Sequence, residues 1–169
     1  MLRQAGVTHL KLSATFANNV QYGIPLVTLW QALQSQLAAV GISVSLHPVD
    51  YNTWVNQLLA GKLTVTTGIW APDYLDSADY FGVFGITGGL NSVFFHMNIP
   101  GSAALFNQYL KTTGSQREAL AAELVRKMQA DATFIPLIQP NRIFVSRSDL
   151  SGVQYSPNKL LNLAALKKK

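Results

Sequence analysis

The chain has 169 residues, of which 49% are hydrophobic and 12% charged, and its formal net charge is +5. This composition excludes a disordered chain and suits one domain with a substantial core. No apolar run reaches the about 18 residues of a membrane span, and the lack of cysteine excludes disulfides and thiolate chemistry. Apart from Lys167–Lys169 the basic residues are scattered, so we expect no nucleic-acid partner.

The first half of the chain predicts strands and helices in alternation. Apolar and polar residues alternate over Thr8–Phe16 and again over Ile42–Val49, as in half-buried strands. Between them, Pro25–Val40 carries apolar residues at three- and four-residue steps, which is typical of an amphipathic helix. Asp50 is suited to cap a second helix, which we expect to end at Gly61.

A third strand is expected at Thr64–Trp70, where the residues are β-branched or apolar and carry no charge. The order is then β-α-β-α-β with short connections, a pattern that produces parallel strands with right-handed crossovers. We therefore predict an α/β fold in which the first strand lies between the other two, in 2-1-3 order. Neither G-x-G-x-x-G nor G-x-x-x-x-G-K-[ST] is present, so nothing indicates a nucleotide cofactor.

The second half predicts further helices and strands. A capping box of Ser115 and Glu118 opens the longer helix, whose apolar stripe includes Leu124 and Val125. The shorter helix, Ser102–Leu110, should face the core with its apolar residues, Leu110 included. We expect a mobile glycine-rich loop at Gly82–Asn91 and a short strand at Val93–Met97. The two helices follow, at Ser102–Leu110 and from Ser115 onward, and then two strands, at Phe134–Gln139 and Arg142–Ser146.

Three aspartates follow the third strand: Asp73, Asp76 and Asp79. A carboxylate just beyond a buried strand is where an open α/β sheet places its ligand contacts. Alternatively, Asp73 only caps the next turn or helix. Trp70, beside this cluster, either belongs to the core or lines a ligand site.

These residues also leave two other kinds of site to consider. The aspartates lack the central glycine of a calcium loop, and the three histidines lack a metal-ligand spacing, so we predict no metal site. Asp73, Asp76 and Asp79 keep open a small α/β hydrolase or another carboxylate-based enzyme. No G-x-S-x-G is present for a serine nucleophile, and nothing in the sequence marks one of the aspartates as a buried acid. We therefore expect no catalytic residues.

Six segments, taken together, resemble one known family. They are L-R-Q-A-G-V, L-A-A-V-G-I-S-V-S-L, Y-N-T-W-V-N-Q-L-L-A-G-K-L, G-I-W-A-P-D-Y-L-D, R-E-A-L-A-A-E-L-V-R-K-M-Q-A-D-A-T-F-I-P-L and L-S-G-V-Q-Y-S-P. In this order they resemble the C-terminal part of the extracytoplasmic solute-binding proteins of ABC importers, in the peptide/nickel class. The fourth segment is similar to that family's tryptophan-x-x-aspartate-tyrosine-x-aspartate signature.

The resemblance implies a periplasmic-binding-protein-like lobe. Residues 1–141 would form the second lobe of a two-lobed protein, and residues 142–169 a return segment that packs on the N-terminal lobe. In peptide-binding relatives the signature aspartate accepts the α-ammonium of the ligand, and the match falls on Asp73. Trp70 and Tyr74 are the further ligand-binding candidates.

The same resemblance implies a function and a location. The protein would bind a peptide or another small solute, without catalysis or cofactor, and deliver it to the membrane permease of an ABC importer. It would act in the periplasm or elsewhere outside the cytoplasm. The first residues, M-L-R-Q-A-G-V, hold no apolar stretch of the signal-peptide kind, which we expect if an N-terminal lobe precedes this sequence in a longer chain.

Overall fold

The computed structural model describes residues 4, 6–7, 9–86, 98–132, 134–139, 141, 143–154 and 161–169. The chain divides into two compact units, Met1–Ile69 and Trp70–Lys169. The expected strand at Val93–Met97 lies outside the described residues. Within the described part of the chain, no helix combines the length and apolar character that crossing a bilayer requires.

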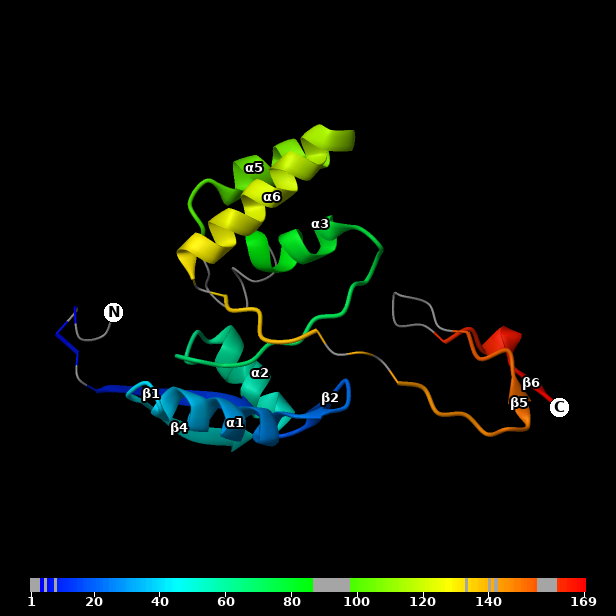
Figure 1. The fold of residues 1–169 in the computed structure, drawn as a ribbon, viewed down its shortest axis with the longest axis horizontal. Coiled ribbons are helices and arrows are strands. Elements are labelled where there is room, and N and C mark those ends of the chain that lie inside the picture. The colour runs from blue at the N-terminus through cyan, green and yellow to red at the C-terminus, as the bar shows by residue number, and fades with distance from the viewer. Residues whose placement is uncertain are drawn as a thin grey trace. The chain divides into compact units, whose positions relative to one another are not determined.

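The first unit is organised on two parallel strands, β1 (Leu10–Ala17) and β4 (Ile42–Val49), which run side by side in Figure 1. On the other side of β1, Ala14 forms a parallel bridge with Val65, and the Thr15 backbone N–H donates to the Val65 carbonyl at 3.1 Å. The order β4, β1, Val65 confirms the predicted 2-1-3 arrangement.

The third strand itself is much shorter than predicted. Only Val65 bridges to β1, and the rest of Thr64–Trp70 is not in a strand. Side chains hold this segment instead: the indole N–H of Trp30 donates to the Thr67 hydroxyl at 3.0 Å, and that of Trp54 donates to the Thr66 hydroxyl at 2.8 Å. These bonds tie the segment to the two helices of the unit in place of a backbone ladder.

A small hairpin lies between β1 and the first helix. It pairs β2 (Val20–Gln21) with β3 (Ile24–Pro25) in antiparallel fashion. Tyr22 and Gly23 form its turn with φ of 50° and 82°, and a two-residue hairpin turn with positive φ matches the twist of paired strands. Pro25 therefore ends a strand rather than filling the first helical turn.

Two helices pack against this sheet. Helix α1 (Leu26–Ala38) buries Leu26 and Trp30, and the Trp30 ring stacks on Phe16 of β1 with centroids 5.5 Å apart. The helix ends two residues earlier than predicted, so Val40 is 64% exposed instead of continuing the apolar stripe.

Helix α2 (Tyr51–Leu59) begins as predicted. The Asp50 side chain accepts the Thr53 backbone N–H at 3.0 Å and caps the helix. Trp54 and Leu58 are buried, whereas Leu59, at the last helical position, is exposed.

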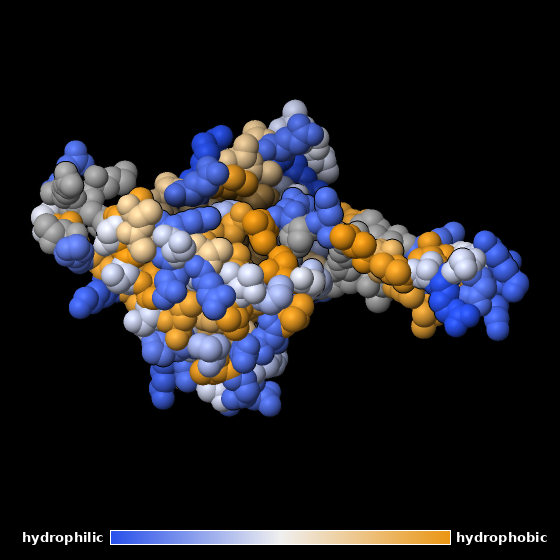
Figure 2. Space-filling view, turned by 60° about the horizontal axis from the view of Figure 1, so that its bottom comes forward, coloured by the Kyte–Doolittle hydropathy of each residue, from blue (hydrophilic) through white to orange (hydrophobic). Residues whose placement is uncertain are grey.

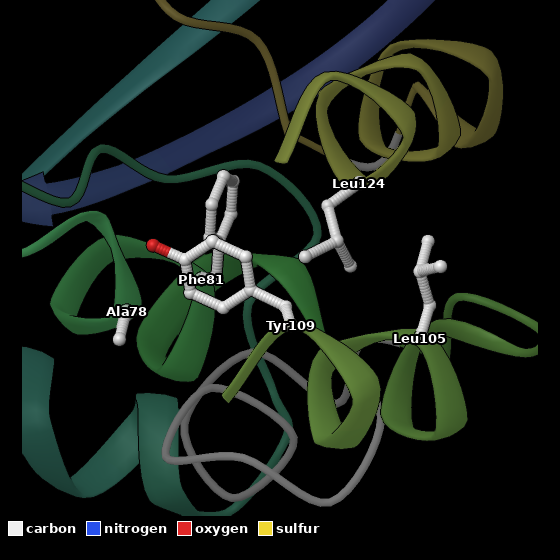
Figure 3. Packing of buried hydrophobic residues seen from close by; sticks show 5 residues of the cluster. All are labelled: Ala78, Phe81, Leu105, Tyr109 and Leu124. Carbon is white, nitrogen blue, oxygen red and sulfur yellow. The ribbon is translucent and has the colours of Figure 1, made fainter. Parts of the chain in front are cut away.

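The second unit has a helical core. It comprises α3 (Ser77–Tyr80), the π-helix η2 (Phe81–Gly85), α5 (Ser102–Leu110) and α6 (Gly114–Asp131). In Figure 3 the side chains of Phe81, Tyr109 and Leu124 converge from three of these elements. The Phe81 and Tyr109 rings meet edge to face at 5.4 Å.

The helix η2 corrects the expectation of a mobile loop from Gly82. Phe81, Val83 and Phe84 are buried in it. Because these apolar side chains are buried, the two glycines beside them do not keep the segment open. Residues 87–91 of the expected loop lie outside the described residues.

The bounds of α5 match the prediction, but details of both long helices do not. Leu110 is exposed at the end of α5, and Val125 is 42% exposed on α6, whereas Leu124 is fully buried. The predicted capping box at Ser115 is wrong, because α6 starts at Gly114 and places Ser115 inside the helix. Its N-cap residue, Thr113, makes no side-chain capping bond.

The two apolar strands predicted after α6 are not formed. Residues 134–139 and 143–146 belong to no helix or strand. A strand requires a partner, and the described residues supply none for this segment. Phe134 is half-buried and stacks on Phe84 with ring centroids 4.7 Å apart. Later side chains are open to solvent, as with Ile143 at 85% and Val145 at 93% exposure, and Figure 2 shows hydrophobic surface along this segment.

The last described elements are short. They are β5 (Leu150–Ser151), the 3-10 helix η3 (Leu163–Ala165) and β6 (Lys167–Lys168), and β5 pairs with β6 in antiparallel fashion.

Candidate functional site

The candidate site is the loop that runs from Trp70 to Asp76 and into α3. It contains the three predicted ligand-binding residues and all three aspartates of the cluster. The aspartates differ sharply in their surroundings. Asp79 is buried, Asp76 is half-buried, and Asp73 is exposed.

Asp79 lies beneath the loop with 5% of its surface exposed. One of its carboxylate oxygens, Oδ2, accepts two hydrogen bonds from the loop. The Trp70 indole N–H donates at 2.7 Å and the Asp73 backbone N–H at 3.3 Å. This carboxylate therefore connects the start of the loop to the residue at its centre.

Asp76 holds the far end of the loop. Its Oδ1 accepts the Ala78 backbone N–H at 2.8 Å and so caps α3. The guanidinium of Arg117, in α6, donates to both carboxylate oxygens at 2.7 and 2.8 Å, and the Tyr109 hydroxyl of α5 donates to Oδ1 at 3.0 Å. The loop is thus fastened to both long helices of the unit.

The charges of this group support one another. The Ala78 backbone N–H, together with Arg117 and Tyr109, holds the pKa of Asp76 below its usual 3.8, although partial burial opposes this. The Arg117 guanidinium carbon lies 4.3 Å from the centroid of the Tyr109 ring, a cation–π contact. Burial, and then the bond to Asp76, raises the pKa of Tyr109.

The three predicted ligand-binding residues occupy different surroundings. Trp70 is half-buried, and its ring meets Phe84 edge to face at 6.3 Å. Asp73 is exposed, and Tyr74 is 51% exposed. The pKa of Tyr74 is raised by its partial burial and then by the negative charges of Asp79, Asp76 and Asp73. Three carboxylates therefore lie close enough to Tyr74 to act on its hydroxyl, and one of them, Asp76, is paired with Arg117.

A hollow of about 620 Å³ borders the loop and includes only part of this set. Tyr74, Tyr80, Tyr109, Arg117 and Glu118 are among its lining residues, but Trp70 and Asp73 are not. Trp70 and Asp73 are therefore connected by hydrogen bonds to Asp79, whereas Tyr74 lines the same hollow as Asp76 and Arg117. The structure does not bring all three predicted residues into one hollow.

This arrangement constrains the chemistry of the site. Asp76 and Asp79 are engaged in internal hydrogen bonds, which are structural roles for two of the three carboxylates in the alternative enzyme hypothesis. Among the described residues, no group of three or more histidine, aspartate or glutamate side chains is placed to hold a metal ion.

Arg117 and Tyr109 were not identified from the sequence as part of the site. Arg117 is 41 residues from Asp76 along the chain, so no local spacing links them. One signal was available: Arg117 lies in the first turn of α6, where the helix dipole disfavours a cation unless an anion is nearby.

Comparisons with known proteins agree on one family and one fold. Residues 1–92 match the family model described as "Bacterial extracellular solute-binding proteins, family 5 Middle". The chain is 27% identical over 131 residues to Di/tripeptide-binding protein 2 of Pseudomonas aeruginosa, covering 75% of this chain and 24% of that protein.

Two solved structures place the whole chain within a larger fold. A dipeptide-binding protein from a Pseudoalteromonas species, in complex with Met-Leu, superposes with a TM-score of 0.84 at 20% identity. The superposition covers 99% of this chain and 34% of that one. NikA from Brucella suis, in complex with Fe(III)-EDTA, gives a TM-score of 0.71 at 14% identity, covering 99% and 36%. The chain thus spans about a quarter to a third of the length of these relatives and shares the fold of that part.

Proposed function

Because the chain belongs to the family 5 bacterial extracellular solute-binding proteins, we propose that it is one lobe of a two-lobed protein that binds peptides for ABC-type import. Peptide is the proposed solute because the curated relative is named a di/tripeptide-binding protein and one structural relative holds Met-Leu. As with other members of a family of extracellular proteins, its proposed location is periplasmic or extracytoplasmic.

The observation that carries this proposal is the exposed Asp73 on a loop whose neighbouring carboxylates are fixed from within. A peptide presents an α-ammonium, and a carboxylate in a closed cleft accepts it in a charge-assisted hydrogen bond. The carboxylates of Asp79, Asp76 and Asp73 lie near Tyr74, and their negative charge supports a cationic group at this loop. Trp70 and Tyr74 would supply aromatic contacts beside it.

The proposed organisation assigns residues 1–141 to the second lobe and residues 142–169 to a return segment. Support comes from the exposed apolar side chains of Ile143 and Val145. Apolar surface of this kind commonly marks an interaction site. The partner we propose for it is the N-terminal lobe, which would belong to the longer chain, and the complete protein would deliver its peptide to a membrane permease.

We propose no catalytic step for this site. Binding and release by closure of two lobes require none, and hinge closure is a common mode of ligand capture. Incubation with peptides should accordingly yield no hydrolysis above a buffer blank. Turnover that disappeared in Asp73→Asn or Asp76→Asn would contradict this part of the proposal.

Calorimetric titration tests the binding proposal. The complete two-lobed protein should bind dipeptides or tripeptides with a free amino terminus, and lose about tenfold or more in affinity in Asp73→Asn, which removes charge but keeps shape. N-acetylated forms of the same peptides are the matched ligand control. They should bind the parent protein as weakly as the free peptides bind the Asp73→Asn variant. Equal affinity for free and acetylated peptides would remove Asp73 from the proposed role.

The 169-residue chain alone should bind these peptides only in the millimolar range or more weakly. One wall leaves the ion pair in water, where it contributes about 0–1 kcal/mol. Micromolar binding by this chain would contradict the single-lobe proposal.

A further inference from the structure

Asp79 has a feature that capping or solubility does not explain. It is buried at 5% exposure, and a single oxygen, Oδ2, accepts both the Trp70 indole N–H and the Asp73 backbone N–H. A buried carboxylate is costly unless donors satisfy it, and here both donors come from the candidate loop. The burial of Asp79 is therefore coupled to the conformation of that loop.

The two bonds act at different points of the loop. One fixes Trp70 at its beginning, and the other fixes the main chain of Asp73. At the loop's end, Asp76 is held by Arg117 and Tyr109. Asp73 therefore lies on a segment anchored on both sides, and Asp79 bonds directly to the Asp73 residue through its backbone N–H.

We propose that Asp79 is a positioning residue for ligand binding. It holds the Asp73 backbone and thereby fixes the place from which the Asp73 carboxylate meets the ligand's ammonium, without itself touching the ligand. This inference rests on the proposed function. Its physical basis is preorganisation, because a loop that is ordered before binding loses less conformational freedom when the ligand arrives.

The location of both bonds on one oxygen suggests a sharp pair of variants. In Asp79→Asn the amide oxygen can occupy the place of Oδ2 and accept both donors, so the loop should stay in position. In Asp79→Ala no acceptor remains. We expect Asp79→Ala to weaken binding about tenfold or more, and Asp79→Asn to remain within about threefold of the parent protein.

Affinity is measured by titration calorimetry on the complete two-lobed protein. The probes are a set of dipeptides and tripeptides with free amino termini, and the tightest of these is used for every variant. Circular dichroism confirms that each variant is folded. If Asp79→Ala does not fold, Asp79→Glu replaces it: one added methylene displaces the oxygens while keeping the charge, and affinity should fall by a similar factor.

A double-mutant cycle separates positioning from general support of the fold. If Asp79 acts mainly through Asp73, then adding Asp79→Ala to a protein that already carries Asp73→Asn should cause a much smaller loss of affinity than Asp79→Ala causes alone. Independent structural damage would instead add its full loss in both backgrounds. Additive losses would therefore overturn the inference, as would unchanged affinity in a folded Asp79→Ala or Asp79→Glu variant.

The outcomes also distinguish this inference from the proposed function. Failure of every peptide to bind, or full affinity in Asp73→Asn, would contradict the proposed function and the inference with it. Strong loss in Asp73→Asn together with parent affinity in Asp79→Ala would overturn the inference alone.

Discussion

The β1–β4 region of the first unit and the aspartate loop of the second are held together in different ways. β1 and β4 pair along eight residues each through their backbones. The loop from Trp70 to Asp79 is instead held by side-chain hydrogen bonds. Trp70 donates to Asp79 within the loop, and Arg117 and Tyr109, on two later helices, donate to Asp76.

This difference predicts where each region is sensitive to substitution. A backbone ladder survives the loss of one polar side chain, but it depends on the apolar contacts that cover the sheet. The loop, by contrast, depends on a few oxygen and nitrogen atoms, so that loss of one of these atoms or of its charge should alter the conformation of the loop or the pH dependence of its stability. The following predictions test this contrast, beginning with the largest expected effect.

Truncation of Phe16 should have the largest effect on stability. Phe16 is fully buried in β1 and stacks on Trp30. Removal of a buried aromatic side chain costs about 3–5 kcal/mol, so Phe16→Ala should lower the free energy of unfolding by that amount in a urea titration. Val40→Ala is the control: Val40 is 64% exposed, and the change should stay within about 0.5 kcal/mol. A loss below about 1 kcal/mol in Phe16→Ala would contradict the packing described for this sheet.

Leu124→Ala should be the next largest change. Leu124 is fully buried among Phe81, Leu105 and Tyr109 in the second unit, and truncation of a buried leucine costs about 2–5 kcal/mol. Val125→Ala provides a control one residue away, because Val125 is 42% exposed. Equal losses in the two variants, measured by thermal unfolding, would show that α6 does not bury the face described here.

These two regions also differ in how well the sequence predicts them. Short-range alternation and short connections predict β1, β4, the two helices beside them and their parallel order, because each signal lies within one segment. The exception is the third strand, where Trp30 and Trp54 bond the threonines that were expected to join the ladder. Side-chain bonds of this kind leave no periodic pattern.

The candidate site was predictable only in part, for the same reason. The cluster of aspartates after a buried segment indicates a loop with functional potential. However, only the structure distinguishes the exposed Asp73 from the buried Asp79, because both follow aromatic or apolar neighbours in the sequence. The partner of Asp76 is 41 residues away. Likewise, the apolar character of residues Ile143 to Val145 predicts that they pack against other residues, but the sequence does not identify those residues.

The acid side of the stability curve should separate two aspartates that both cap helices. Asp50 is held below its usual pKa by Thr53, and Asp76 by Ala78 and then by Arg117 and Tyr109. A carboxyl with a lowered pKa in the folded state stabilises the fold at pH values above its unfolded value of 3.8 and loses this contribution as pH falls through the lowered value.

We therefore expect the melting temperature to fall as pH drops below about 4, with a shallower fall in Asp76→Asn. Asp50→Asn is the matched control, because asparagine caps a helix about as well as aspartate, and Asp50 has no comparable guanidinium partner among its bonds to described residues. If both variants reduce the acid-induced fall in melting temperature equally, the pairing of Asp76 with Arg117 contributes nothing to the pH dependence of stability.

The smallest expected effect is that of Tyr109→Phe, which removes one hydroxyl and keeps the ring. The ring contacts with Phe81 and the Arg117 guanidinium remain possible, and Arg117 still donates to both oxygens of Asp76. The change removes the 3.0 Å bond to Asp76, and a single hydrogen bond contributes about 0.5–1.5 kcal/mol. Thermal unfolding should show a loss in that range.

The matched change in the first unit is Thr67→Val, which removes the acceptor of the Trp30 indole and leaves a donor without its partner. Because an unsatisfied donor costs about 1–3 kcal/mol where it is buried, Thr67→Val should cost at least as much as Tyr109→Phe, even though it lies beside the backbone-paired strands. A larger loss in Tyr109→Phe would mean that the hydroxyl organises the Asp76–Arg117 pair as well as bonding to it. The loop would then depend on single polar atoms more strongly than the first unit does.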